Sequence, residues 1–216
     1  MPKAVLFDFD GTLADTASDL GGAVNRLRGE RGLPELPIDE VRPFASSGAR
    51  GLLRVGFGMT PEHPEYEAMR RAFLDHYEHH ICVHTRLFAG IPELLAEISS
   101  RGIAWGIVTN KSTRLTTLIV KELPLAPAPA CVVCGDTTPH LKPHPAPLLH
   151  AAGELGVDPA DCLYLGDDLR DVQAAHAAGM QTVAVEYGYH GTENGGPRSW
   201  KADYVIARPL DLIAHL

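Results

Sequence analysis

The feature that most constrains the fold is an alternation of apolar and amphipathic segments over the second half of the chain. Short apolar runs with the length of buried strands occupy residues 103–110, 131–134, 162–165, 182–185 and 204–206. Segments with helical spacing occupy residues 92–101, 112–122, 145–155 and 172–178. This alternation is typical of parallel strands joined by crossover helices. We therefore expect an α/β fold, a Rossmann-like doubly wound parallel sheet with helices on both faces.

One more strand is expected near the N-terminus, over residues 4–9, where apolar and aromatic residues dominate. The block that follows, residues 14–88, has helical spacing and no pattern that predicts a strand. Residues 87–92 contain Gly90 and Pro92 and are typical of a return linker. We therefore predict a core domain of residues 1–13 plus 89–216, and an inserted helical cap domain of residues 14–88.

The helices of the inserted block have recognisable ends. Asp15, Thr16 and Ser18 supply the residue types that cap a helix N-terminus. The other signals are Gly32 at the end of that first helix, a polar loop at 46–50 that opens a second helix, and a third helix over 61–82.

Polar side chains follow several of the expected strands at their carboxyl ends. They are Asp8 and Asp10, Thr109 and Asn110, Lys142, and Asp167 and Asp171. In open parallel sheets, ligands bind beyond the carboxyl ends of the strands. The convergence of these separate clusters on one edge predicts a ligand site there.

The stretch that ends the first strand carries the clearest chemistry. Asp8 and Asp10 are two residues apart, so a strand would point both carboxylates to the same side. Two such carboxylates at a poorly solvated strand end require a cation or a shared proton. Gly11 lets the backbone amides turn toward an anion, and Thr12 adds a hydroxyl donor. This ordered set favours a site for a metal and a phosphoryl group over a strand end with solvated acids.

Composition excludes several classes of function. The chain has 216 residues, 45% of them hydrophobic, and a formal net charge of −8. That charge argues against a nucleic-acid partner, which requires a basic face. No apolar run approaches the roughly 20 residues of a membrane helix, and the N-terminus lacks the pattern of a secretory signal. We expect a cytoplasmic protein, monomeric or homodimeric, with no membrane partner.

Two patterns invite a metal interpretation that we do not favour. Cys131 and Cys134 form a CxxC, but they lie in an apolar run without a second CxxC, so buried reduced thiols are expected in place of zinc. His76 and His80 are four residues apart without an acid in an HExxH pattern, so solvation or packing is the better interpretation. Residues 188–200 form a Gly-rich loop.

The chain resembles the haloacid dehalogenase superfamily in four motifs taken in order: Asp8-Phe9-Asp10-Gly11-Thr12, Thr109, Lys142, and Gly166-Asp167-Asp168-Leu169-Arg170-Asp171. The resemblance covers essentially the whole chain, and the block 14–88 stands where that superfamily places a helical cap. Any one motif alone would be weak, whereas the ordered set is highly specific.

The resemblance implies a phosphomonoesterase that works through an aspartyl phosphate. Asp8 would be the nucleophile, and Asp10 would protonate the leaving alcohol and then deprotonate the attacking water. Lys142 would neutralise Asp8 and the phosphate. Asp8, the Asp10 main-chain carbonyl and Asp167 would bind Mg²⁺. Phosphoryl binding would involve Gly11, Thr12, Thr109 and Asn110. Asp171 would orient Lys142 or a water, and Asp168 would have a supporting role.

The substrate is less constrained. The sequence as a whole resembles phosphoglycolate phosphatases. Several segments resemble N-acetylmuramic acid 6-phosphate phosphatases of the same group still more: Ser47-Gly48-Ala49-Arg50, Leu87-Phe88-Ala89-Gly90, Gly166 to Asp171, and Tyr187-Gly188-Tyr189. Both substrates combine a phosphate monoester with a carboxylate, which Arg50 of the expected cap loop would bind, although an ordinary surface arginine is an equal alternative. The retained Asp10 favours phosphate esters over carbon–halogen or phosphonate cleavage. A phosphosugar mutase, a sugar-phosphate phosphatase of broad specificity and a non-catalytic binding protein are the alternatives.

Overall fold

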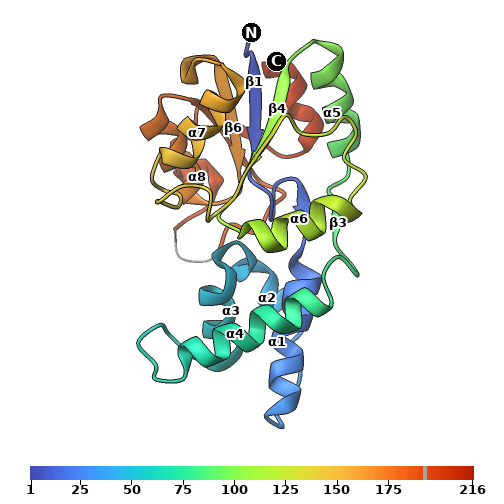
Figure 1. The fold of residues 1–216 in the computed structure, drawn as a ribbon, viewed down its shortest axis with the longest axis vertical. Coiled ribbons are helices and arrows are strands. Elements are labelled where there is room, and N and C mark those ends of the chain that lie inside the picture. The colour runs from blue at the N-terminus through green and yellow to red at the C-terminus, as the bar shows by residue number, and fades with distance from the viewer. Residues whose placement is uncertain (192–193) are drawn as a thin grey trace.

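The computed structural model describes residues 1–191 and 194–216 and contains the predicted parallel sheet. Its six strands are ordered β5-β4-β1-β6-β7-β8, and every neighbouring pair is parallel. The strands are β1 (Ala4–Phe7), β4 (Ala104–Val108), β5 (Cys131–Val133), β6 (Cys162–Gly166), β7 (Gln181–Val185) and β8 (Tyr204–Ile206). Figure 1 shows β1 inside the sheet, so the residues that follow it emerge at the middle of the carboxyl edge.

The two faces of the sheet bury different side chains of β1. Val5 and Phe7 belong to one hydrophobic cluster with residues of α5 (Ile91–Ser100) and α6 (Thr113–Glu122). Ala4 and Leu6 belong to the other, with residues of α7 (Ala146–Leu155) and α8 (Leu169–Ala178). This period-two division of a fully buried strand is the pattern of a sheet covered on both faces, and it confirms the predicted fold class.

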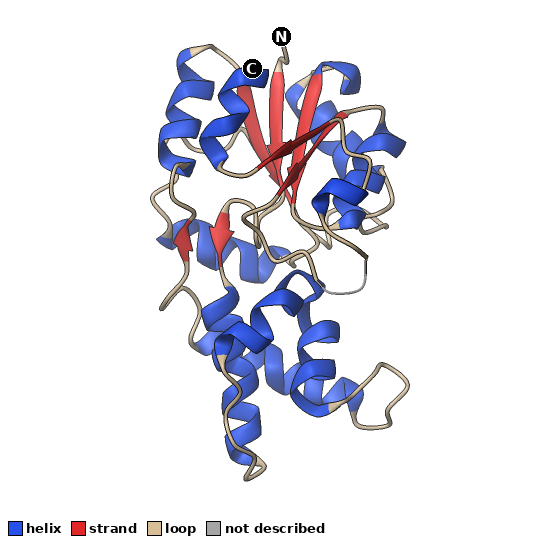
Figure 2. Cartoon of the chain, turned by 180° about the vertical axis from the view of Figure 1, so that it is seen from behind, coloured by secondary structure: helices blue, strands red, loops and turns tan. Residues whose placement is uncertain are grey.

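The inserted helices pack together at the carboxyl edge of the sheet (Figures 1 and 2). They are α1 (Ala17–Glu30), α2 (Ile38–Val41), a 3₁₀ turn (Arg42–Ser47), α3 (Gly48–Phe57) and α4 (Tyr66–His79). Leu20 and Val24 of α1, Leu52 of α3, and Phe73 and Tyr77 of α4 are buried in one cluster that continues into the sheet layer. The apolar stripe of α4 is therefore core, as its spacing predicts.

The prediction that the block 14–88 lacks strands is wrong at both of its ends. Ala14–Asp15 (β2) pairs antiparallel with Arg86–Leu87 (β3), and Figure 2 shows this ribbon between the sheet and the inserted helices. Two-residue strands are too short to leave a periodic signal. The ribbon joins the two segments through which the chain enters and leaves the inserted block.

Several expected details of the elements also differ. The first strand ends at Phe7, so Asp8 and Asp10 lie in the turn beyond it. The expected helix over 61–82 covers only Tyr66–His79, because residues 61–65 around Pro64 form turns. The Thr16 side chain makes no N-cap hydrogen bond. The Tyr189 hydroxyl accepts hydrogen bonds from the backbone N–H groups of Thr16 (2.7 Å) and Ala17 (3.0 Å) in its place.

The remaining sequence features are placed as follows. Cys131 lies in the second hydrophobic cluster with Cys162, and burial raises the pKa of the Cys131 thiol to about 12. His80 Nδ1 lies 3.1 Å from the His76 carbonyl oxygen. Within the Gly-rich loop 188–200, Thr192 and Glu193 lie outside the described residues. No described helix is long and apolar enough to cross a membrane.

Candidate active site

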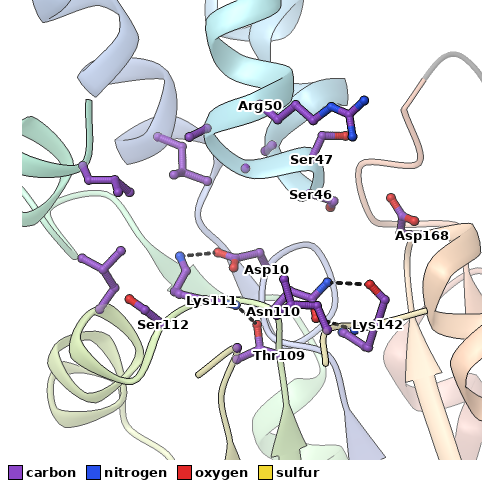
Figure 3. A pocket seen from close by; sticks show the side chains of 18 of the residues that line it. Asp10, Ser46, Ser47, Arg50, Thr109, Asn110, Lys111, Ser112, Lys142 and Asp168 are labelled. Atoms are coloured by element: carbon purple, nitrogen blue, oxygen red, sulfur yellow. Dashed lines mark hydrogen bonds and ion pairs between the residues drawn. The ribbon is translucent and has the colours of Figure 1, made fainter. Parts of the chain in front are cut away.

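A cavity of about 560 Å³ lies between the carboxyl edge of the sheet and the inserted helices. Its lining includes eight residues that the sequence singled out: Asp8, Asp10, Arg50, Thr109, Asn110, Lys142, Asp168 and Asp171. Figure 3 shows Asp10, Thr109, Asn110 and Lys142 below Ser46, Ser47 and Arg50 of the inserted block. Residues far apart in the chain thus converge at the sheet edge that the strand pattern indicated.

Lys142 lies at the centre of the buried charges. Its Nζ is 2.8 Å from Asp8 Oδ1 and 2.8 Å from Asp171 Oδ1, and it donates to the Tyr164 hydroxyl at 2.7 Å. The lysine side chain is only 3% exposed, so these contacts are hardly screened by water. The structure thus places the lysine amine against the first aspartate. A single ammonium serves two carboxylates, which leaves the group net negative.

Burial sets the protonation of these groups. Removal of Asp8 from water raises its pKa to about 7, although the nearby Lys142 acts in the opposite direction. Burial of Lys142 by itself lowers its pKa, but Asp171 and Asp8 outweigh it, and the pKa lies above its ordinary value. At neutral pH the lysine is charged and Asp8 is poised between its two forms.

Three buried carboxylates are close enough together to hold a metal ion. Oxygen atoms of Asp8, Asp167 and Asp171 all lie within 4.8 Å of one another. Desolvation, followed by the charges of Asp8 and Asp171, raises the pKa of Asp167 well above its usual range. Such a set is unfavourable without a cation, and carboxylate oxygens are the ligands of hard divalent ions such as Mg²⁺. The donor set fits a divalent cation.

Asp167 is fixed from several directions. Its Oδ2 accepts from the Tyr189 backbone N–H (2.9 Å) and from the Ser46 hydroxyl (2.7 Å) of the inserted block. Its Oδ1 accepts from the Thr12 hydroxyl at 3.4 Å. Thr12 is fully buried and is not among the described residues that line the cavity. Its hydroxyl therefore faces the Asp167 carboxylate, whereas a contact with a phosphoryl group was expected.

Two glycines allow the backbone to approach Asp167. Gly11 has φ +82°, and a Cβ there would overlap the Asp167 carboxylate. A Cβ on Gly188 would overlap the Asp167 Cβ and the Gly11 carbonyl oxygen. Gly11 was expected to free its amide for an anion, but its N–H donates to the Ala14 carbonyl at 3.0 Å, and the structure gives a packing reason for glycine. The role of Gly188 was missed, because nothing in a Gly-rich loop indicates which glycine makes a close contact.

Asp10 belongs to a second charged group, next to the first. Its Oδ1 accepts from the Thr16 hydroxyl at 2.6 Å and from Lys111 Nζ at 2.7 Å. Lys111 Nζ also donates to the hydroxyl of Tyr77 on α4 at 2.9 Å. No motif in the sequence indicated a role for Lys111. Tyr77 is a core residue of α4, and its hydroxyl gives it a second contact.

Thr109 and Asn110 organise the loops around Lys142. The Asn110 side chain accepts from the Lys142 backbone N–H at 2.9 Å and donates to the Lys142 carbonyl at 3.0 Å. Thr109 is buried, and its backbone N–H donates to the Val133 carbonyl at 2.9 Å. The Asn110 side-chain amide therefore holds the lysine loop, and phosphoryl binding by the backbone near Asn110 stays a prediction.

The predicted supporting acids have clear partners. Asp171 binds Lys142, as expected of a residue that orients the lysine, and its Oδ2 accepts from the Asp168 backbone N–H at 3.0 Å. Asp168 caps α8 and accepts from Arg170, whose Nη2 reaches the Ser46 carbonyl at 2.8 Å. Arg170 thus connects the α8 terminus to the inserted block.

Comparison with known proteins gives a consistent result. Residues 5–185 match the family model described as haloacid dehalogenase-like hydrolase. The chain is 44% identical to an N-acetylmuramic acid 6-phosphate phosphatase of Pseudomonas aeruginosa, over 98% of this chain and 93% of the relative. It is 42% identical to a phosphoglycolate phosphatase of Xanthomonas campestris pv. campestris, over 98% and 95% of the two chains. A crystal structure of a predicted phosphoglycolate phosphatase from Haemophilus somnus superposes with a TM-score of 0.86 at 27% identity, covering 99% and 97% of the two chains.

Proposed function

The chain belongs to the haloacid dehalogenase-like hydrolase family and is a phosphatase of that family. We propose that it cleaves phosphate monoesters with Mg²⁺ through an aspartyl phosphate on Asp8. The observation that carries the proposal is the 2.8 Å contact between Lys142 Nζ and Asp8 Oδ1, within a buried carboxylate group of which Asp8 and Asp171 line the cavity. This arrangement supports an ionised nucleophile whose charge is compensated.

The metal would be held by Asp8, Asp167 and the main-chain carbonyl of Asp10. When bound, Mg²⁺ supplies positive charge that lets a carboxylate approach a phosphate dianion. Asp171 would hold Lys142 in place, since it shares the ammonium with Asp8. Lys142 then faces both the nucleophile and the phosphoryl oxygens, with Thr109 beside them.

The reaction proceeds in two balanced steps. In the first, an Asp8 carboxylate oxygen forms a bond to phosphorus, the bond from phosphorus to the ester oxygen breaks, and Asp10 gives its proton to that oxygen. In the second, Asp10 takes a proton from a water whose oxygen forms a bond to phosphorus, and the bond between Asp8 and phosphorus breaks. Phosphate leaves, Asp8 is restored as a carboxylate and Asp10 as an acid.

The inserted block serves as a cap over this chemistry. We assign residues 14–88 to the cap and residues 1–13 plus 89–216 to the core, with the β2–β3 ribbon at the junction. The Ser46 hydroxyl of the cap donates a hydrogen bond to Asp167, and the Ser46 carbonyl accepts one from Arg170. These contacts close one side of the cavity with the cap. Such closure excludes bulk water from the reacting groups and brings specificity residues to the substrate.

The cavity favours a substrate larger than a two-carbon acid. Its volume of about 560 Å³ falls in the range of roughly 300–1,000 Å³ that is typical of drug-sized ligands. Apolar side chains line part of it, among them Phe73, Leu74, Leu115 and Leu141. A phosphorylated amino sugar that bears a carboxylate, such as N-acetylmuramic acid 6-phosphate, uses this space and this apolar surface better than 2-phosphoglycolate does.

Arg50 is the proposed partner of the substrate carboxylate. It lines the cavity on the cap side, and Figure 3 shows it above Asp10. A guanidinium can bind a carboxylate through two parallel hydrogen bonds. The phosphate at Asp8 and the carboxylate at Arg50 would then fix the two ends of the substrate.

One assay tests the function. Released phosphate is measured with Mg²⁺ across N-acetylmuramic acid 6-phosphate, 2-phosphoglycolate, hexose phosphates and nucleotides. We expect the highest kcat/KM for N-acetylmuramic acid 6-phosphate. Preference for 2-phosphoglycolate would overturn the argument from cavity size, and an isomerised sugar phosphate without free phosphate would indicate a mutase. Binding without phosphate release would refute the enzyme.

A pair of arginine variants tests the carboxylate contact. Arg50→Ala should raise KM for carboxylated esters and leave KM for p-nitrophenyl phosphate nearly unchanged, because only the former lose a partner. Arg26→Ala removes the same charge from an exposed position of α1 and should change neither value. Equal effects of Arg50→Ala on both esters would dismiss the contact.

A further inference from the structure

We propose that Lys111 is a positioning residue for Asp10, and that Tyr77 of α4 anchors the lysine to the inserted helices. The inference rests on the proposed function, because it concerns the acid–base step assigned to Asp10. Lys111 Nζ lies 2.7 Å from Asp10 Oδ1 and 2.9 Å from the Tyr77 hydroxyl. Figure 3 shows the Lys111 side chain directed at the Asp10 carboxylate along the cavity wall.

The backbone of Lys111 is held on both sides. Its N–H donates to the Thr109 hydroxyl at 3.2 Å, and its carbonyl accepts from the Gly135 N–H at 2.8 Å. A Cβ on Gly135 would overlap the Asn110 carbonyl oxygen, so the two loops meet at close range. The lysine therefore projects from a fixed point, and its ammonium has a defined position relative to Asp10.

The two donors to Asp10 leave one oxygen open for chemistry. Both Lys111 Nζ and the Thr16 hydroxyl bind Oδ1. Oδ2 accepts no hydrogen bond from any residue that the structure describes, and Asp10 lines the cavity. Fixing Oδ1 in this way directs Oδ2 to the space where the ester oxygen and the attacking water must exchange a proton. A small misplacement of such a group is costly to the rate.

The burial of Lys111 argues against an incidental surface contact. Its side chain is 7% exposed, and its ammonium lies 4.7 Å from the centre of the Tyr77 ring as well as at the hydroxyl. A buried ammonium is costly unless it is paired, and here it is paired with a core carboxylate and a cap phenol. Because Tyr77 belongs to α4, the position of the Asp10 carboxylate depends on the seating of the inserted helices.

The test uses four variants of the full chain. Lys111→Met removes the ammonium, Lys111→Arg keeps a cation, and Tyr77→Phe removes only the hydroxyl. Lys121→Met, on the exposed side of α6, is the matched control. We expect Lys111→Met to lower kcat about 10- to 100-fold, part of the 10²–10⁴ supplied by acid–base catalysis, with little change in KM. Lys111→Arg should recover most of the loss, and Lys121→Met should match wild type.

Pre-steady-state kinetics separate positioning from a structural role. The nitrophenolate group of p-nitrophenyl phosphate leaves without a proton, whereas hydrolysis of the aspartyl phosphate requires Asp10. Lys111→Met should therefore show a burst of one nitrophenolate per enzyme, followed by slow turnover. Tyr77→Phe should have a smaller effect that is not additive with Lys111→Met, since both act through one contact.

Specific results would overturn the proposal. Wild-type kcat in Lys111→Met would overturn it. An equal loss of kcat on alkyl and aryl esters, without a burst and with a lowered Tm, would also overturn it. Full additivity of the two single variants would remove Tyr77 from the argument. Failure of the phosphatase itself is distinct from these outcomes, because wild-type protein would then release no phosphate from any ester.

Discussion

If the carboxylate group binds Mg²⁺ as proposed, the raised pKa of Asp8 should make that binding dependent on pH. Burial raises the pKa of Asp8 to about 7, and a carboxylate must lose its proton before it can bind a metal. Below neutral pH the proton competes with the ion for the same oxygen atoms. Between pH 6 and pH 8 the ionised fraction of a group with this pKa rises about tenfold, so the apparent Mg²⁺ affinity should rise about tenfold.

The change can be measured as a shift in Tm. A tenfold change in affinity corresponds to about 1.4 kcal/mol of stabilisation when Mg²⁺ is in excess at both pH values. For a chain of this size, that free energy corresponds to about 3 to 6 °C. The increase in Tm on adding Mg²⁺ should therefore be about 3 to 6 °C larger at pH 8 than at pH 6.

The metal-free protein should show the opposite trend. Between pH 4 and pH 7, the folded protein keeps a proton on Asp8 that the unfolded chain has released, because the folded pKa is about 7 and the ordinary value is 3.8. The contribution of Asp8 to the free energy of unfolding then falls as pH rises through that window. Asp8→Asn removes this titration and should weaken both trends, leaving the part that the raised pKa of Asp167 contributes. An equal Tm increase from Mg²⁺ at pH 6 and pH 8 would refute the reasoning.

Two further predictions concern the framework of the site. Gly188→Ala forces a Cβ against Asp167 and Gly11, so we expect weaker Mg²⁺ binding and a free energy of unfolding lowered by about 1–3 kcal/mol. Mg²⁺ titration and urea unfolding measure the two effects, and wild-type affinity would contradict the close contact. Asp19 accepts from the backbone N–H of Thr85 (2.9 Å) and from its hydroxyl (2.7 Å), so Asp19→Ala should leave buried donors unpaired and cost about 3 kcal/mol. An unchanged urea midpoint would show that those donors find water.

The sequence predicted the parts of the site that depend on local pattern. Asp8, Thr109, Lys142 and Asp171 all follow strands, and a parallel sheet brings strand ends together whatever the intervening loops do. The division of β1 into two buried faces follows from its unbroken apolar run. These features required no knowledge of how the inserted helices are seated.

The contacts between the layers could not be predicted in the same way. Tyr77 matched the apolar stripe of a helix, and only the packing of α4 brings its hydroxyl to Lys111. Thr16 looked like an N-cap, but the Tyr189 hydroxyl from a distant loop meets the backbone there and leaves Thr16 for Asp10. Such roles depend on tertiary approach between segments far apart in the chain, which residue spacing does not encode.

The pairing of β2 with β3 was not predicted, for a related reason. The β2–β3 ribbon joins Ala14–Asp15 to Arg86–Leu87, and neither dipeptide alternates over enough residues to indicate a strand. Their pairing follows from the position of the inserted block, which brings its two ends side by side. The longer helices α1 and α4 were easier to predict, because each repeats its apolar residues over several turns, whereas the four-residue α2 was not predicted.

The most direct test of the central claim is to identify the phosphorylated residue. During turnover with Mg²⁺, the enzyme is quenched in acid, treated with borohydride, which reduces an acyl phosphate to an alcohol, and digested for mass spectrometry. We expect conversion of Asp8 to homoserine, with Asp10 in the same peptide unchanged. Active enzyme that carries the modification on another residue, or that shows none while a phosphorylated form is trapped, would contradict it.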